Sequence, residues 1–294
     1  MSKCGYVSVV GRPNAGKSSL LNWLVGEKIA MVSHKANATR KRSNIIVMHN
    51  DAQIVFVDTP GLHETEKLLN QFMLDEALKA IGDCDLILFL APVTDKLTHY
   101  ESFLEKNTKN TKHLLLLTKI DNVTNTEVLA KIKEYEAFAD KYEGIIPVSI
   151  KKQTKQSDIL DVVEKLLPVH PYLYDTEIMT TEHMRDIFKE FIREAIFDNI
   201  SDEIPYETDV LINKVDEKHN LDVIKATIIV QKSTQKGMLI GKGAAAVKRI
   251  GKDARMKIEK LTGRKCYLEL FVSIKKGWTK NREGLKDLGY DVTF

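Results

Sequence analysis

Residues 11–18 read GRPNAGKS, and this stretch decides the fold that we expect for the chain around it. It matches the spacing G-x-x-x-x-G-K-[ST] and lies between a strand-like run, Tyr6–Val10, and a helix-like run, Lys17–Val25. Gly11 and Gly16 permit a tight turn and a close approach that a Cβ atom would block. Backbone N–H groups in such a turn, helped by the positive end of the following helix, bind phosphate oxygens. The stretch therefore predicts a phosphate-binding loop at the end of a strand.

Strand-like and helix-like runs alternate around this loop over residues 1–167. The expected strands are Tyr6–Val10, Ile45–His49, Ile54–Asp58, Asp85–Ala91, His113–Thr118 and Gly144–Ser149. The expected helices are Lys17–Val25, Glu66–Ile81, Tyr100–Lys106, Thr126–Asp140 and Ser157–Leu167. This alternation predicts an α/β domain with a mostly parallel sheet flanked by helices on both faces. Pro168 and Pro171 break the pattern, so we assign residues 168–180 to a linker.

A different rhythm follows the linker and predicts a second, α+β domain over residues 181–294. Its expected elements are a helix at Thr181–Asn199, strands near Thr208–Val215 and Asp222–Val230, a helix from Ala244, a strand at Lys265–Ser273 and a less regular tail. The net charge of the chain is +3, but residues 232–286 alone hold 16 Lys and Arg against 4 Asp and Glu. A solvated face does not need such an excess, which favours a phosphate-rich partner for this domain.

The side chains that follow the second glycine of the loop carry most of its expected chemistry. Lys17 can reach the outer phosphates of a nucleotide, and the Ser18 hydroxyl can ligate Mg²⁺. The alternative is a chance match to the pattern, and the strand–loop–helix context argues against it. The positions of the loop that we expect to bind nucleotide are Gly11, Asn14, Ala15, Gly16, Lys17, Ser18 and Ser19.

A second set of residues is expected at the outer phosphates. Asp58 ends an apolar strand and begins the tetrad D-T-P-G, so its carboxylate can hold Mg²⁺ while the N–H of Gly61 binds a terminal phosphate. The polar stretch at residues 33–44 reads as a loop that a third phosphate could order, with Thr39 as a further Mg²⁺ ligand. An ordinary loop threonine is the alternative for Thr39. The residues expected to act in catalysis are Lys17, Thr39, Asp58 and Gly61.

Two more motifs point to guanine. TKID at residues 118–121 ends a strand, and a carboxylate at Asp121 can accept two hydrogen bonds that guanine offers and adenine does not. SIK at residues 149–151 follows another strand and could close over the base. The expected base-binding residues are Thr118, Lys119, Asp121, Ser149, Ile150 and Lys151. A second match, NKVD at residues 213–216, has no phosphate loop before it within its segment, and we do not assign it to the site.

The ordered set of motifs resembles the translation-factor class of GTPases, and DTPGLH with the later basic domain resembles the Era family. That family usually has Asn where this chain has Thr118 and Ala where it has Ile150. Leu62 occupies the position that often carries a water-orienting Gln, so we expect slow intrinsic hydrolysis. Asn14 resembles the asparagine with which related GTPases hold K⁺. The expected cofactors are therefore Mg²⁺ and, as an activator, K⁺.

Residues 237–260 open with a Gly-rich turn and continue as a basic helix, which resembles the core of a KH (type II) domain. The G-x-x-G loop of such domains clamps single-stranded RNA, although the second glycine is Ala244 here. A helix start with solvated lysines is the alternative. The expected RNA-binding residues are Ile240, Gly241, Lys242, Gly243, Ala244, Lys248 and Arg249.

The resemblance to the Era family covers nearly the whole chain and implies partners that composition alone does not. These are GTP and GDP, the 3′ end of 16S ribosomal RNA and the 30S subunit in whose maturation such proteins act. It also implies a cytoplasmic monomer, partly peripheral on the inner membrane face. A constitutive RNA-binding scaffold with GTP or GDP as a structural ligand is the alternative.

Composition agrees with these expectations. No apolar stretch approaches the roughly 20 residues of a membrane-spanning helix, and the N-terminal residues lack the pattern of a signal peptide. The three cysteines, Cys4, Cys84 and Cys266, lie far apart and form no C-x-x-C pair, which disfavours a disulfide framework and fits a reducing cytosol.

Overall fold

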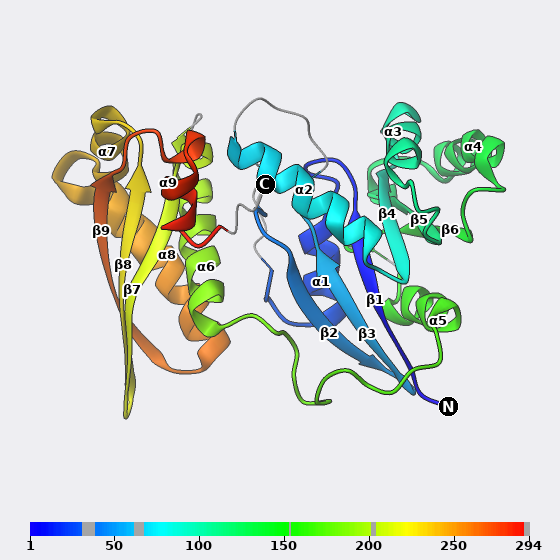
Figure 1. The fold of residues 1–294 in the computed structure, drawn as a ribbon, viewed down its shortest axis with the longest axis horizontal. Helices are drawn as coiled ribbons and strands as arrows, with labels where there is room; N and C mark the ends of the chain where they lie inside the picture. The colour runs from blue at the N-terminus through cyan, green and yellow to red at the C-terminus, as the bar shows by residue number, and fades with distance from the viewer. Residues whose placement is uncertain (31–38, 62–67, 153, 201–203, 291–294) are drawn as a thin grey trace. The chain divides into compact units, whose positions relative to one another are not determined.

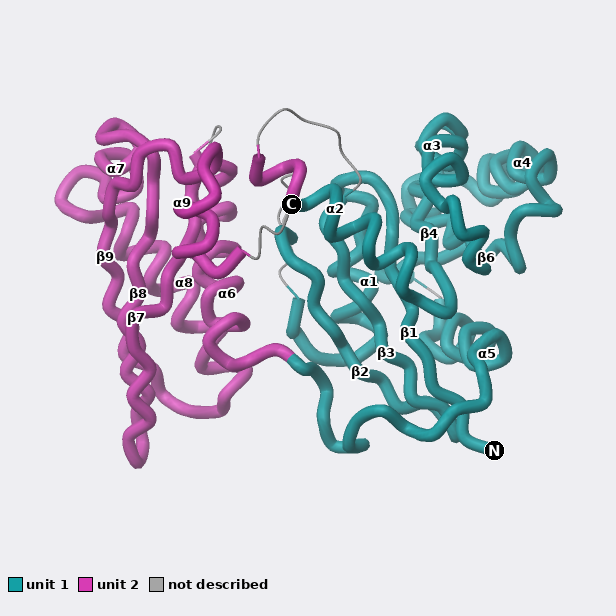
Figure 2. Tube along the Cα trace, viewed as in Figure 1, with its two compact units in different colours: residues 1–30, 39–64, 73–181 teal, residues 31–38, 65–72, 182–294 magenta. Residues whose placement is uncertain are grey.

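The structure is a computed structural model that describes residues 1–30, 39–61, 68–152, 154–200 and 204–290. The chain forms two compact units (Figure 2). Among the described residues, the first comprises 1–30, 39–61, 73–152 and 154–181, and the second comprises 68–72, 182–200 and 204–290. In the described part of the chain, no helix has both the length and the apolarity needed to cross a bilayer.

The first unit is built on a six-stranded sheet of order β2-β3-β1-β4-β5-β6 (Figure 1). Its strands are β1 (Lys3–Val10), β2 (Ser43–His49), β3 (Ala52–Asp58), β4 (Leu86–Pro92), β5 (His113–Thr118) and β6 (Gly144–Val148). Only the β2–β3 pair is antiparallel, and the other pairings are parallel. The mostly parallel sheet is therefore confirmed, and the carboxyl ends of the parallel strands share one edge.

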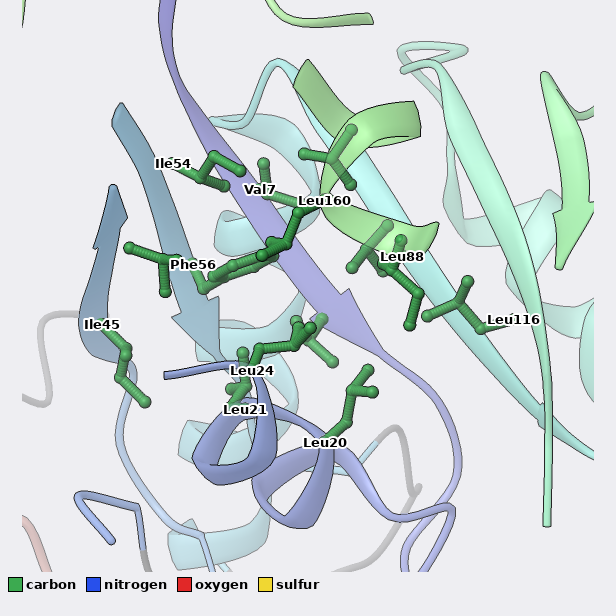
Figure 3. Packing of buried hydrophobic residues seen from close by; sticks show 14 of the residues in the cluster. Val7, Leu20, Leu21, Leu24, Ile45, Ile54, Phe56, Leu88, Leu116 and Leu160 are labelled. Atoms are coloured by element: carbon green, nitrogen blue, oxygen red, sulfur yellow. The ribbon is translucent and has the colours of Figure 1, made fainter. Parts of the chain in front are cut away.

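Helices cover both faces of this sheet because successive side chains of each strand point to opposite faces. The helices are α1 (Lys17–Val25), α2 (Leu68–Gly82, of which residues 73–82 belong to this unit), α3 (Thr98–Lys106), α4 (Asn125–Tyr135) and α5 (Gln156–Leu166). On one face, leucines of α1 and α5 pack against β1, β3 and β4. Figure 3 shows Leu20 of α1, Leu160 of α5 and Phe56 of β3 in this cluster. On the other face, a second buried cluster contains residues of α2, α3 and α4, including Tyr100.

The predicted limits of these elements agree with the structure at the most regular places and differ at the ends. Helix α1 and strand β5 have the predicted bounds. Helix α4 stops at Tyr135, and a short 3-10 turn at Glu136–Phe138 replaces the predicted continuation to Asp140. The predicted start of α2 at Glu66 lies outside the described residues.

Residues 168–180, assigned to a linker from sequence, hydrogen-bond to the sheet of the first unit. Fully buried Gln53 on β3 accepts hydrogen bonds from the N–H groups of Leu173 (2.8 Å) and Tyr174 (2.9 Å) and donates to the Tyr174 carbonyl (2.8 Å). Farther along, the Ile46 N–H donates to the carbonyl of Met179 (2.8 Å). These contacts make the segment a strap, which we define as residues 168–180, bound to strands β2 and β3.

The second unit contains a three-stranded sheet of order β7-β8-β9, with β7–β8 antiparallel and β8–β9 parallel. The element order is α6 (Met184–Asn199), β7 (Asp209–Lys218), β8 (Leu221–Val230), α7 (Ser233–Ile240), α8 (Ala245–Thr262), β9 (Lys265–Ile274) and α9 (Arg282–Lys286). Buried side chains of α6, α7 and α8 pack with the inner residues of the strands to form its core. This α+β arrangement is the fold predicted for the second domain.

Two features of this unit were missing from the sequence prediction. Helix α7 was not predicted, and its residues 237–240 were treated as the start of a Gly-rich turn. The Gln235 side chain caps this helix by accepting hydrogen bonds from the N–H groups of Gln231 and Lys232, both at 2.9 Å. The tail is also more ordered than expected, because Trp278 and Leu285 are fully buried and the Trp278 indole donates to the Glu207 carbonyl (3.2 Å). The Trp278 contact joins residues 71 positions apart and has no local sequence pattern.

We predict that Gln53→Leu lowers the free energy of unfolding by about 2–3 kcal/mol, because it removes the three hydrogen bonds that the buried Gln53 side chain makes with the backbone of Leu173 and Tyr174. Urea denaturation measures this change. Gln71→Leu, at an exposed position of α2, is the matched control and should change stability by less than about 0.5 kcal/mol. Equal effects of the two substitutions would contradict the role given to Gln53.

Candidate functional site

The carboxyl edge of the parallel strands brings together the motifs of the first unit. Strands β1, β3 and β5 end at Val10, Asp58 and Thr118, and Ser149 directly follows β6. Ligands of open α/β sheets bind outside this edge. The phosphate loop, the D-T-P-G tetrad and the two base motifs are thus neighbours although they span residues 11–151.

The backbone of the phosphate loop requires glycine at its first position. A Cβ atom on Gly11 would lie 2.9 Å from the Leu90 carbonyl oxygen, so a larger residue would push the loop away from β4. Gly16 has φ 103°, which side chains rarely adopt, and it directly precedes helix α1. The ammonium of Lys17 bends back over the loop and donates to the carbonyl oxygens of Gly11 (3.2 Å) and Arg12 (3.3 Å).

Lys17 and Asp58 are both buried next to this loop, and burial disfavours the charged form of each. Burial lowers the pKa of Lys17 to about 8, and the negative charge of Asp58 opposes that shift. Burial raises the pKa of Asp58 to about 6, and Lys17 is the strongest opposing influence. A phosphate beside Lys17 and a cation beside Asp58 would therefore each favour the charged form of its neighbour.

Three oxygen-bearing side chains that we predicted as Mg²⁺ ligands lie together. The Ser18 hydroxyl donates to Asp58 Oδ2 (2.9 Å) and lies 3.2 Å from Thr39 Oγ1, which is itself 3.4 Å from Asp58 Oδ2. The other carboxylate oxygen, Asp58 Oδ1, is buried and has no hydrogen-bond partner within the described residues. Hard oxygen donors and a buried carboxylate oxygen with spare capacity fit a magnesium ion that retains some of its water.

Gly61 packs directly against the phosphate loop. A Cβ atom there would meet Pro13 Cγ at 2.8 Å and Pro13 N at 2.9 Å, so glycine is required for this approach. Leu62, the position considered for orienting water, follows immediately and lies outside the described residues.

The base motifs connect to the loop and to each other. Thr118 Oγ1 donates to the Ala15 carbonyl (3.3 Å), and Lys119 Nζ donates to the Asn14 carbonyl (2.8 Å). The Ser149 hydroxyl donates to Asp121 Oδ1 (2.8 Å), which lowers the pKa of that carboxyl group. These contacts tie the guanine motif to the main chain of the phosphate loop.

Ser19, Ile150 and Lys151 have less definite places. Ser19 lies in the first turn of α1, and Ile150 is exposed. Lys151 Nζ lies 4.0 Å from Asp121 Oδ2 and the Lys151 side chain is 80% exposed, so this ion pair does little to hold Asp121 in place. NKVD at residues 213–216 lies in β7, where Lys214 pairs with Asp216 at 2.7 Å and the Asn213 side chain accepts from Thr227.

Asp95 is a site-adjacent residue that the sequence analysis missed. Its carboxylate pairs with the guanidinium of Arg12 inside the phosphate loop, with an N–O distance of 2.6 Å. The available signal was the one used for Asp58, namely a carboxylate shortly after an apolar strand. No motif marks Asp95, so only the structure reveals its partner.

The predicted RNA loop of the second unit joins α7 to α8. Gly241 (φ 70°), Gly243 (φ 60°) and Ala244 (φ 63°) all have positive φ, so the chain makes a tight turn there. For Ala244 this conformation costs about 1–2 kcal/mol. Ile240 is half-buried at the end of α7.

Three basic side chains accompany this turn. Lys242, Lys248 and Arg249 are exposed, and Arg249 also donates to the Asn199 carbonyl (3.0 Å). The turn thus offers a bare main chain next to positive charge.

Comparisons with known proteins agree with this description. The family described as a 50S ribosome-binding GTPase matches residues 6–119, and the KH domain family matches residues 203–279. "GTPase Era" of Campylobacter lari is 50% identical over 289 residues, covering 98% of this chain and 99% of the relative. "GTPase Era" of Campylobacter fetus subsp. fetus is 49% identical over 284 residues, covering 97% and 98%.

Solved structures give the same result. The crystal structure of Era in complex with MgGDPNP and nucleotides 1506–1542 of 16S ribosomal RNA has a TM-score of 0.94 and 32% identity, with coverage of 99% of this chain and 100% of the other. An Aquifex aeolicus Era variant bound to GDP.AlF4⁻ has a TM-score of 0.94 and 33% identity, with the same coverage.

A phosphate-binding loop on a mostly parallel sheet, followed by a KH domain, defines a P-loop GTPase with an attached KH module. With half of its residues identical to curated relatives over the full length, the chain belongs to the Era family of GTPases. The resemblance noted from the sequence motifs is thereby confirmed.

We predict that Thr118→Val weakens the binding of GDP and of a nonhydrolysable GTP analogue alike, by about five- to tenfold. The valine methyl group replaces the hydroxyl that donates to the Ala15 carbonyl, and a lost hydrogen bond has about this effect. Calorimetry in magnesium buffer measures both affinities. Thr126→Val, at an exposed position of α4, is the matched control, and unchanged affinity of Thr118→Val would disprove the bracing role.

Proposed function

We propose that this GTPase is a nucleotide-controlled switch that binds the 3′ end of 16S ribosomal RNA and acts in the maturation of the 30S subunit. The observation that carries the proposal is the pairing of a guanine-nucleotide site with a basic KH module in one chain. The Era structure at 0.94 TM-score, which contains both MgGDPNP and a 16S fragment, supports it. The proposed boundaries are residues 1–167 for the GTPase domain and 181–294 for the KH domain.

In the nucleotide site, we assign the loop amides and Lys17 to the phosphates, and Asp121 with Ser149 to the guanine base. Ser18, Thr39 and Asp58 would hold Mg²⁺, which when bound neutralises charge on the outer phosphates. Phosphoryl transfer depends on such positioning and neutralisation more than on covalent chemistry. Because the leucine at position 62 cannot orient a water molecule, we propose that intrinsic hydrolysis is slow and that a partner accelerates it.

In the KH module, we assign the turn at residues 240–244 to the RNA backbone, with Lys242, Lys248 and Arg249 at its phosphates. The net charge of +12 over residues 232–286 supports this assignment. Binding should weaken as salt rises, because RNA releases bound cations when lysine and arginine neutralise its phosphates. We also propose that the protein is a cytoplasmic monomer with a peripheral fraction on the inner membrane face.

A switch and a constitutive scaffold differ in one measurable quantity. We predict that a single-stranded RNA with the 3′-terminal sequence of 16S ribosomal RNA binds more tightly with a nonhydrolysable GTP analogue than with GDP, by about fivefold or more. Equal affinities would favour the scaffold. Lys242→Gln should weaken RNA binding in both nucleotide states. Lys133→Gln, at an exposed position of α4, is the control and should leave RNA binding unchanged.

We further predict that K⁺ raises the rate of GTP hydrolysis above that in Na⁺ at equal ionic strength, through the Asn14 side chain. Steady-state phosphate release in the two salts measures the effect. Asn14→Ala should remove the difference between the salts while retaining nucleotide binding. Equal rates for the unmodified protein would exclude the K⁺ role.

A further inference from the structure

Arg12 and Asp95 form a two-point ion pair beside the phosphate loop. Arg12 Nε donates to Asp95 Oδ2 and the terminal Nη2 donates to Asp95 Oδ1, both at 2.6 Å. The Asp95 carboxylate is only 6% exposed and the Arg12 side chain 32% exposed. A guanidinium held at two parallel hydrogen bonds is fixed in orientation as well as in position.

The fixed guanidinium in turn holds the main chain around Pro13. Arg12 Nη1 donates to the Pro13 carbonyl (3.0 Å), and the Arg12 carbonyl accepts from the Lys17 ammonium (3.3 Å). Pro13 is the residue against which Gly61 packs, with no room for even a Cβ atom between them. A continuous set of contacts therefore runs from Asp95 through Arg12 and Pro13 to Gly61.

The other end of the phosphate loop has its own supports. Lys119 holds the Asn14 carbonyl and Thr118 holds the Ala15 carbonyl. Loss of the Arg12–Asp95 pair would consequently free the guanidinium that holds the Pro13 carbonyl and leave the contacts of Asn14 and Ala15 in place. Gly61, which we assign to the terminal phosphate, packs against Pro13 at the first of these two ends.

We propose that Asp95 is a positioning residue that, by holding Arg12 and Pro13, sets the Gly61 N–H for the third phosphate and so favours GTP over GDP. This inference rests on the proposed assignment of Gly61 to the terminal phosphate. It differs from the bracing role of Thr118, whose loss should affect GDP and GTP alike. Loss of Asp95 should therefore weaken the binding of GTP and leave the affinity for GDP nearly unchanged.

The test compares Asp95→Asn with the unmodified full-length protein in magnesium buffer, by calorimetry with GDP and with a nonhydrolysable GTP analogue. We expect the analogue to bind about tenfold more weakly and GDP to change by less than about twofold, within the usual range of coupling between sites. Glu134→Gln removes a surface ion pair on α4 of the same 2.6 Å length and is the matched control, expected to change neither affinity.

Arg12→Lys provides a second variant, since lysine keeps the charge but cannot form the two-point contact. It should show the same selective loss, and the double variant Arg12→Lys with Asp95→Asn should be no worse than either single one. Equal loss for both nucleotides, or no loss, would overturn the role of Asp95. Failure of the unmodified protein to bind either nucleotide would instead overturn the proposed function.

Discussion

Parallel pairing of β1 with β3 on one side and with β4 on the other is the constraint on which the first unit depends. In this register Val9 lies opposite both Asp58 and Leu88, so the phosphate loop leaves the sheet at the level of the Asp58 carboxylate. Leu20, Leu21 and Leu24 then anchor helix α1 against the sheet, which fixes the direction of the amides at its start. A one-residue slip would turn every buried side chain of β1 to the other face.

Burial shifts the pKa values of two charged residues beside the phosphate loop. Lys17 and Asp58 have lost most of their water, and their pKa values move toward neutrality for that reason. Their mutual attraction offsets only part of the loss. A polyanion and a divalent cation together would supply the remaining compensation, which is why the proposed ligands come as a pair. Packing against the sheet buries these charged groups, and carbonyl oxygens of the phosphate loop accept hydrogen bonds from Lys17.

The second unit follows a different physical logic, in which an exposed turn matters more than a buried charge. The turn between α7 and α8 has three residues at positive φ, and its basic side chains remain in solvent. The hydrophobic cluster of this unit consists of buried side chains of α6, α7, α8 and the strands. The buried Trp278 ties the tail of the chain to this unit through the Glu207 carbonyl. The same chain thus combines a site with buried charged side chains and a turn whose charged side chains are exposed to solvent.

The fold class, the motif residues and most of the order of the elements could be predicted from the sequence. This was possible because strand–helix alternation and glycine spacing are local properties, as the correct bounds of α1 and β5 illustrate. Helix α7 was missed because Gly237 obscured a helix that the Gln235 cap and tertiary burial of Leu239 support. The folded structure was needed to show that Gln53 binds the strap, that Asp95 pairs with Arg12 and that Gly61 packs against Pro13. Those contacts join residues 48 to 121 positions apart, and no spacing rule along the chain encodes which distant partners the sheet brings together.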